Sequence, residues 1–338
     1  MSRILTGDRP TGALHLGHYF GTLANRVRLQ RGGHEVFLVI ADYQVISDRD
    51  RPGDLDHTVS GLVLDYLGCG LDPDETVIFP HSAVPALNQL LLPFLSLVSM
   101  GELLRNPTVK EEISLAGRST VSGLMFTYPV HQAADVLFCQ ADLVPVGRDQ
   151  LPHLELTRSI ARRFNDRYGQ VFPLPDALLG EAPVLAGLDG RKMGKSLGNG
   201  IALADPQDLV AAKIRAARTD SEREVTYEPG RRPHAANLLR IAGLCARREP
   251  EDVAAQIGSG GALALKDVVT QAVCEFLAPI QERRAAFAPE DVRRVLSHGT
   301  AIANDVAERT LHEVRAAMGM TYRHIARRAA AGCVTVEA

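Results

Sequence analysis

The chain has 338 residues, of which 46% are hydrophobic and 23% are charged, and its formal net charge at pH 7 is −3. This length is enough for two domains with a large buried core, and so balanced a charge means that any nucleic acid must be bound by local basic patches. No apolar run reaches membrane-spanning length, no basic-then-apolar leader is visible, and the five isolated cysteines show neither metal-ligand spacing nor a disulfide framework. We therefore expect a cytoplasmic protein with reduced cysteines.

The first part of the sequence alternates between strand and helix patterns. Residues 3–6 form a short apolar run typical of a buried strand, and residues 17–30 carry apolar side chains at nearly helical spacing. A continuous apolar run at 35–42 is typical of a parallel strand covered on both faces. Residues 54–67 predict the next helix, and residues 76–79 predict the third strand. This order predicts a doubly wound parallel α/β sheet, in which ligands bind at the carboxyl ends of the strands.

The remainder of the chain is predicted to be mostly helical. A helical insertion is expected at about residues 85–140, followed by a strand at 142–147 and a last strand candidate at 183–188. No convincing strand pattern follows, and helices are predicted at 205–218, 235–247, 250–258, 264–288 and 290–317. The change of pattern near residue 200 predicts an α/β domain over residues 1–200 and an all-helical domain over residues 201–338.

A glycine-rich turn links the first strand to the first helix, within residues 6–19. Backbone N–H groups and the positive end of the helix suit a phosphate group at this turn. His15 and His18 add hydrogen-bond donors, and Gly17 between them lets a flat base or a ribose approach the start of the helix. The alternative is an ordinary turn of a doubly wound fold, in which both histidines have structural partners.

A second glycine-flanked segment, residues 189–200, lies near the expected domain boundary. Lys192 and Lys195 are three residues apart on it, and two lysines on a mobile loop can clamp a triphosphate. Taken alone, a charge cluster of this kind is more often a solvated surface loop.

Together these two segments resemble the paired signatures of class I aminoacyl-tRNA synthetases. The first resembles the "HIGH" signature in the form HLGH, and the run GDRPTG before it is similar to the tryptophanyl branch of the family. Residues 192–196 resemble the "KMSKS" signature in the form KMGKS, with Gly194 at the usual serine position. The resemblance implies a Rossmann-like catalytic domain with a helical insertion, followed by a helical anticodon-binding domain.

Two further stretches between the signatures resemble tryptophanyl-tRNA synthetases. One is TYPVHQAAD at residues 127–135, in which the family's acceptor for the indole N–H maps onto Asp135; without the resemblance, Asp135 reads as a helix-surface carboxylate. The other is PVGRDQLPHLE at residues 145–155, where Asp149 can accept from ribose hydroxyls or cap the following helix. Gln44, His131 and Gln132 depart from the residues that relatives usually carry.

The resemblance assigns candidate residues to each part of the site. The expected catalytic residues are His15, His18, Lys192 and Lys195. The expected ATP-binding residues are Arg9, Pro10, Thr11, Gly17, His18, Gly147, Arg148, Asp149, Val184, Lys192, Met193, Gly194, Lys195 and Ser196. The expected tryptophan-binding residues are Gly7, Gln44, Gln132, Asp135 and Gln150. No protein metal ligands are expected, because Mg²⁺ in such sites is held mainly by phosphates.

As the resemblance implies, the carboxylate of L-tryptophan attacks the α-phosphorus of ATP to give tryptophanyl-adenylate and pyrophosphate, and the acyl group then passes to the terminal adenosine of tRNA(Trp). The resemblance also implies a homodimer. Three alternatives stay open at this point: a tyrosyl-tRNA synthetase of the same architecture, a small-molecule nucleotidyltransferase, and a paralogue that binds tryptophan or tRNA without ligating them. The long helical region after the lysine loop is evidence against the nucleotidyltransferase.

Overall fold

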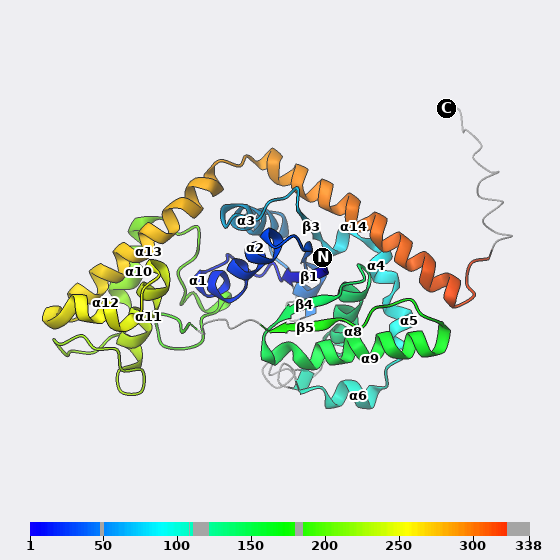
Figure 1. Ribbon diagram of the computed structural model, residues 1–338, viewed down its shortest axis with the longest axis horizontal. Coiled ribbons are helices and arrows are strands. Elements are labelled where there is room, and N and C mark those ends of the chain that lie inside the picture. The colour runs from blue at the N-terminus through cyan, green and yellow to red at the C-terminus, as the bar shows by residue number, and fades with distance from the viewer. Residues whose placement is uncertain (48–50, 108, 111–121, 180–184, 323–338) are drawn as a thin grey trace.

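The computed structural model describes residues 1–47, 51–107, 109–110, 122–179 and 185–322 (Figure 1). Its centre is a parallel five-stranded sheet with the order β3-β2-β1-β4-β5. The strands are β1 (Arg3–Asp8), β2 (Glu35–Ile40), β3 (Thr76–Pro80), β4 (Leu143–Val146) and β5 (Asp176–Leu179). The chain builds outward from β1 in one direction through β2 and β3, and in the other through β4 and β5. This reversal of strand order confirms the doubly wound sheet and places a ligand crevice beside β1.

The segment after β1 is more irregular than the single helix that the sequence predicts for residues 17–30. It consists of a short helix α1 (Leu16–His18), a π-helical turn η1 (Tyr19–Leu23) and a regular helix α2 (Ala24–Arg31). A π-helical turn inserts an extra residue into the helical register and is frequent at functional sites. This turn begins directly after His18, whose ring lies next to that of His15.

Helices cover both faces of the sheet. Between β2 and β3 lie η2 (Tyr43–Ser47) and α3 (Leu55–Gly68), and between β3 and β4 the helical insertion is confirmed. The described part of the insertion contains η3 (His81–Ala83), α4 (Pro85–Gln89), α5 (Leu91–Leu95), α6 (Met100–Arg105) and α8 (Gly123–Leu137). After β4 the chain forms η4 (Arg148–Gln150) and α9 (Leu151–Tyr168).

The fifth strand lies elsewhere than predicted. β5 is Asp176–Leu179, whereas residues 185–188 form no strand, apart from one isolated bridge between Ala186 and Lys192, and residues 183–184 lie outside the described chain. β5 is a sheet edge with mostly exposed side chains, so its sequence lacks the continuous apolar run of a covered strand. The apolar residues near 185 do not reflect a strand. Leu185 is buried in the core that continues into the helical region.

The helical region after residue 200 follows the prediction closely. A short turn η5 (Lys195–Leu197) precedes it, and its elements are α10 (Gln207–Ala216), α11 (Pro233–Ala246), α12 (Pro250–Ile257), η6 (Gly258–Gly260), α13 (Gly261–Ala285) and α14 (Pro289–Ala317). In Figure 1, α10 to α13 lie to one side of the sheet, and α14 runs back across it. α14 packs closely on β3, where a side chain at Gly299 would overlap the carbonyl oxygen of Ile78. The division at residue 200 stays a prediction, and α14 returns to the sheet whichever side it is assigned to.

Two apolar clusters hold these layers together. Alternate residues of β2 enter different clusters: Leu38 and Ile40 belong to one, and Phe37 and Val39 to the other. The first cluster continues without a break from the sheet into α10, α11 and α13, so the sheet and the helical region share a core. Among the helices of the described chain, none combines the length and the apolar character needed to cross a bilayer.

Candidate active site

The turn after β1 is the centre of the candidate site. His15 and His18 lie with their ring centroids 3.8 Å apart, and the backbone N–H of His15 donates to Nδ1 of His18 over 3.2 Å. Two backbone hydrogen bonds tie this turn to the segment after the lysine loop: Leu16 N to Ile201 O at 3.0 Å and Leu203 N to Leu14 O at 2.9 Å. The two signature segments, nearly 180 residues apart in the sequence, are therefore held together by the backbone itself.

Both histidines are neutral at pH 7. Burial, together with the positive charge of Lys195, lowers the pKa of His15 to about 4. Burial, then the neighbouring His15 and Lys195, lowers the pKa of His18 to about 3. A neutral imidazole donates one N–H, so in this state the two side chains offer hydrogen bonds to a ligand without adding positive charge.

The lysine loop lies over the same turn. Lys195 Nζ donates to the carbonyl oxygen of Arg9 at 3.1 Å, and a side chain at Gly12 would contact Lys195 Cβ at 3.6 Å. Met193, which follows Lys192, is buried next to Gly17, where a Cβ would lie 3.2 Å from its sulfur. Burial lowers the pKa of Lys195, and the negative charge of Asp8 opposes part of that effect.

Asn199 fixes the shape of the lysine loop, and sequence reasoning did not find it. Its Oδ1 accepts from the backbone N–H of Gly194 at 3.0 Å. Its Nδ2 donates to Asp189 Oδ1 at 2.9 Å and to the carbonyl oxygen of Lys192 at 3.0 Å. One buried amide therefore connects three points of the loop. Gly194, at the position where the family signature has its serine, is held through its backbone N–H.

A cavity of about 660 Å³ opens beside the turn, at the carboxyl ends of β1 and β4. Its lining includes residues expected to bind the amino acid and residues expected to bind ATP. These are Gly7, Gln44, Gln132, Asp135 and Gln150 for the amino acid, and Arg9, Gly147 and Lys192 for ATP. Arg9 connects these ends, because its Nη2 donates to the carbonyl oxygen of Gln44 at 3.0 Å while its own carbonyl oxygen accepts from Lys195. His15, His18 and Lys195 lie at the turn next to this cavity and are not part of its lining.

The aspartate at the amino-acid end is buried inside the protein. Asp135 on α8 is 3% exposed, so the reading of this residue as a helix-surface carboxylate is wrong. Gln44 Nε2 donates to its Oδ2 at 3.4 Å, and Nδ1 of His81 lies 3.0 Å from its Oδ1. Burial, and next the negative charge of Asp42, raises the pKa of Asp135 well above its ordinary value.

The floor of the cavity contains an ion pair that the sequence pattern did not indicate. Arg26 on α2 forms an ion pair with Asp8 and donates to Thr6 Oγ1 at 2.9 Å and to the carbonyl oxygen of Gly7 at 3.0 Å. The Tyr66 hydroxyl donates to the same oxygen of Asp8 at 2.9 Å. The sequence shows only an arginine within the first predicted helix, and that does not identify its partner.

The structure also places the remaining predicted residues. Pro10 is buried in the turn, Thr11 donates its backbone N–H to the carbonyl oxygen of Arg9 at 2.8 Å, and Arg148 is exposed at the edge of the sheet. Val184 lies outside the described residues, and the side chains of Asp149 and Ser196 are also outside the description. Within the described chain, no group of three histidine, cysteine or acidic side chains is arranged to hold a metal ion.

Known proteins resemble this chain over nearly its whole length. The family model of class I tRNA synthetases (W and Y) matches residues 1–278. Tryptophan–tRNA ligases from Treponema pallidum and Streptococcus pyogenes serotype M1 are each 42% identical, over 96% and 94% of this chain and 98% of their own. The crystal structure of tryptophanyl-tRNA synthetase from Campylobacter jejuni, complexed with ADP and tryptophan, superimposes with a TM-score of 0.83 at 28% identity, covering 94% of this chain and 99% of that one.

The chain therefore belongs to the class I tRNA synthetases of the tryptophan and tyrosine family, and it is an aminoacyl-tRNA synthetase. Within that family it is a tryptophan–tRNA ligase, as its relatives at 42% identity are. The solved tyrosyl-tRNA synthetase from Archaeoglobus fulgidus is 23% identical with a TM-score of 0.64, a likeness that shows the shared fold alone.

Proposed function

We propose that this enzyme activates L-tryptophan at the cavity between β1 and β4 and then transfers it to tRNA(Trp), with the roles given below. The observation that carries the proposal is the path through Arg9, whose side chain contacts the Gln44 end of the cavity while its backbone contacts Lys195. A carboxylate held at the Asp135 end would meet the α-phosphate of a nucleotide held at the turn. Bringing the two reactants together in this way supplies much of the rate.

The amino-acid end would hold the indole ring. Asp135 accepts the ring N–H, and Gln44, Gln132, Gln150 and Gly7 line the space around it. A buried acceptor of this kind discriminates strongly against an analogue that has no N–H to offer, because the acceptor is then left without a partner. This arrangement accounts for the preference for tryptophan.

The nucleotide end would act by electrostatics. Negative charge grows on the phosphoryl oxygens as the carboxylate attacks, so donors and cations that are already in place stabilise the transition state. His15 and His18 would donate neutral hydrogen bonds, and Lys192 and Lys195 would supply positive charge. The nucleotide would approach the backbone closely at Gly17, Met193 and Gly194. The remaining residues proposed to border the nucleotide are Pro10, Thr11, Gly147, Arg148, Asp149, Val184 and Ser196.

A magnesium ion would accompany ATP. Asp8, the carboxylate at the end of β1, is already paired with Arg26 and Tyr66, so the described residues here fit an ion that is held by phosphates and not by a protein cage. Such an ion neutralises charge on the phosphate oxygens. We further propose, as the resemblance to the family implies, that the enzyme is a homodimer and acts in the cytoplasm.

Exchange of labelled pyrophosphate into ATP tests the proposal. We expect exchange with tryptophan and none with tyrosine; an absence of exchange with tryptophan would favour a protein that binds without ligating. Because the chain contains no tryptophan, fluorescence excited beyond tyrosine absorption reports the bound amino acid alone. Asp135→Ala should abolish the emission change, whereas the control Asp305→Ala, at an exposed position of α14, should leave it intact. An unaltered titration in Asp135→Ala would remove this residue from the pocket.

A further inference from the structure

A cluster of two histidines and an asparagine lies directly behind Asp135. His81 follows β3 and is fully buried, His131 precedes Asp135 by one turn of α8 and is 4% exposed, and their ring centroids are 4.3 Å apart. Asn88 on α4 lies within hydrogen-bonding distance of both rings. Phe79 and Phe138 in the surrounding core are fully buried as well. Polar groups at this depth need partners for every hydrogen-bonding atom.

The hydrogen bonds of Asn88 fix which nitrogens of the histidines carry protons. Its Nδ2 donates to the carbonyl oxygen of Val84 at 3.3 Å, so its Oδ1 is the acceptor on the other side. That oxygen contacts Nε2 of His81 at 2.9 Å and Nε2 of His131 at 2.7 Å. Both Nε2 atoms are therefore N–H donors. A neutral His81 then has a bare lone pair on Nδ1.

That lone pair faces Asp135. Nδ1 of His81 lies 3.0 Å from Oδ1 of Asp135, and neither atom has another hydrogen-bond partner in the described chain. Two such atoms at this distance repel unless one proton lies between them. The pair therefore holds a single proton, either as a carboxyl group with a neutral imidazole or as a carboxylate with an imidazolium, and in both cases it is electrically neutral.

The surroundings favour the proton on Asp135 when the pocket is empty. Burial, with a contribution from His131, lowers the pKa of His81 to about 3, while burial and Asp42 raise the pKa of Asp135. The other titratable groups around the pair are Tyr43, whose ring is 5.5 Å from that of His81, and Cys139, whose thiol lies 4.0 Å from the Asp135 carbonyl oxygen. Neither brings a positive charge that would hold a carboxylate.

We propose that His81 is a positioning residue that holds the shared proton of Asp135 and so presents Oδ2 to the ring N–H of the substrate. The inference rests on the proposed function, since it deepens the role of Asp135. When the indole N–H donates to Oδ2, the O–H bond at Oδ1 breaks and an N–H bond forms at Nδ1 of His81. Asp135 thereby becomes a carboxylate, the stronger acceptor, and no net charge is added to a buried site.

Two amide substitutions distinguish the role of Nδ1 of His81 from the role of Nε2. His81→Asn can place an amide near the position of Nδ1, where its N–H can stabilise the carboxylate form of Asp135 although the amide cannot take the proton. His81→Gln reaches the position of Nε2 and keeps the contact with Asn88 but not the one with Asp135. If His81 acts through Asp135, the glutamine variant is the more damaging one and the asparagine variant retains part of the function; if His81 only supports the cluster around Asn88, the order is reversed.

The measurement compares tryptophan with its benzothiophene isostere, in which sulfur replaces the ring N–H. In pyrophosphate exchange we expect His81→Gln to raise KM for tryptophan about tenfold, because a charged acceptor is replaced by a neutral one, with kcat within about threefold. For the isostere, KM should stay within about twofold of wild type, because no N–H reaches Oδ2. His81→Asn should raise KM for tryptophan by less than His81→Gln does, because its N–H still stabilises the carboxylate of Asp135.

Equal losses for tryptophan and the isostere, or a wild-type KM in His81→Gln, would overturn the inference, and so would an asparagine variant as impaired as the glutamine variant. Failure of the proposed function looks different, because the wild-type enzyme itself would then give no exchange with tryptophan. In that case the emission titration of tryptophan on wild type and His81→Gln still decides the role of His81: equal affinities would refute it, and a loss of about tenfold would support it.

Discussion

Replacement of Arg26 by methionine tests the ion pair under the cavity. Arg26 is 3% exposed at its side chain and supplies the only cation in direct contact with Asp8 among the described residues. Arg26→Met keeps most of the side-chain volume but removes the donors to Thr6 and Gly7. It leaves the carboxylate of Asp8 with the Tyr66 hydroxyl as its one remaining side-chain partner in that part of the chain.

The expected loss follows from the burial of the partner left behind. Removing one member of a buried ion pair costs about 3–5 kcal/mol, because the other charge stays desolvated. Asp8 retains 11% of its side-chain exposure and faces the cavity, so water reaches it and the lower figure, about 3 kcal/mol, applies. Arg26→Lys keeps the charge but not the planar fork, so it should lose about half as much.

The pH dependence gives the sharper test. Burial alone would raise the pKa of Asp8, but the charge and hydrogen bond of Arg26 hold that pKa well below its usual range. In wild type the resulting stabilisation is present above the unfolded pKa of about 3.9 and is lost as the pH falls below it. Without Arg26 the pKa of Asp8 rises, so protonation relieves the variant first, and the difference between the two proteins shrinks from pH 7 to pH 4.

Urea unfolding at pH 7 and at pH 4, followed by circular dichroism, measures both quantities from the midpoints and slopes. A difference below about 1 kcal/mol at pH 7 would show that the pair contributes no more than a surface salt bridge. A difference that is the same at both pH values would show that Asp8 is not the group left uncompensated.

Three further outcomes are expected. Lys195→Ala should slow pyrophosphate exchange about 100-fold or more while the affinity for tryptophan stays within about threefold, and a large loss of affinity would contradict its assignment to the nucleotide end. Gly299→Ala should cost about 2 kcal/mol or more in thermal unfolding because α14 must move away from β3, whereas Gly61→Ala, with open space around it, should not destabilise. Because the pKa values of His15 and His18 are lowered on folding, their contribution to stability should be present above about pH 6.5 and lost toward pH 4, and His15→Asn with His18→Gln should flatten that fall.

Much of the architecture could be predicted because it depends on local patterns. Strands β2 and β3 place residues in both apolar clusters and β1 has a buried centre, so these strands read as apolar runs. The long helices α13 and α14 have apolar residues at helical spacing. β5 was missed because an exposed edge strand of four residues lacks such a run. The two signature segments were found because ligand chemistry restricts both the residue types and their spacing.

The residues that hold the signatures in place could not be predicted, because their partners are distant in the sequence. Asp65 on α3 accepts from the backbone N–H of Leu14 at 3.4 Å and from Nε of Arg284 on α13 at 2.9 Å. A single carboxylate therefore connects the turn after β1 to the helical region. Asp65 is 2% exposed, and this burial raises its pKa to about 6 in spite of Arg284.

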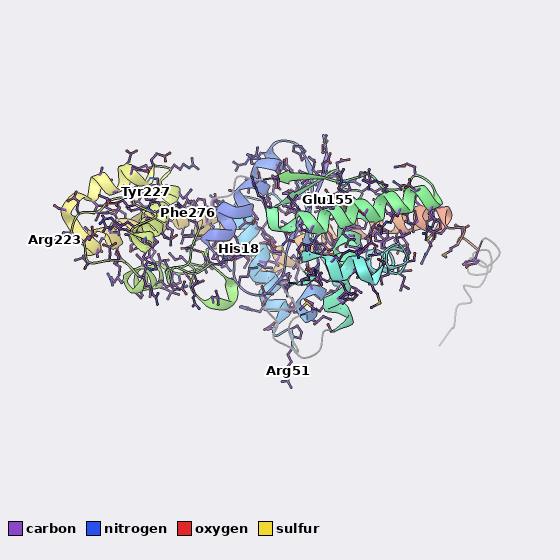
Figure 2. All side chains as sticks on the ribbon, turned by 90° about the horizontal axis from the view of Figure 1, so that it is seen from below. His18, Arg51, Glu155, Arg223, Tyr227 and Phe276 are labelled. Carbon is purple, nitrogen blue, oxygen red and sulfur yellow. The ribbon has the colours of Figure 1, made fainter. Side chains whose placement is uncertain are left out.

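The same turn is also held on its other side by aromatic packing. Tyr19 and Phe20, directly after His18, pack on Phe276 of α13 with ring centroids 4.8 and 5.2 Å away, and His18 and Phe276 mark the junction between the sheet and the helical region in Figure 2. Other large apolar residues could have made these contacts, so no pattern in the sequence predicts them. A short motif can therefore reveal which side chains meet a ligand, while the geometry that makes them effective depends on contacts across the whole fold.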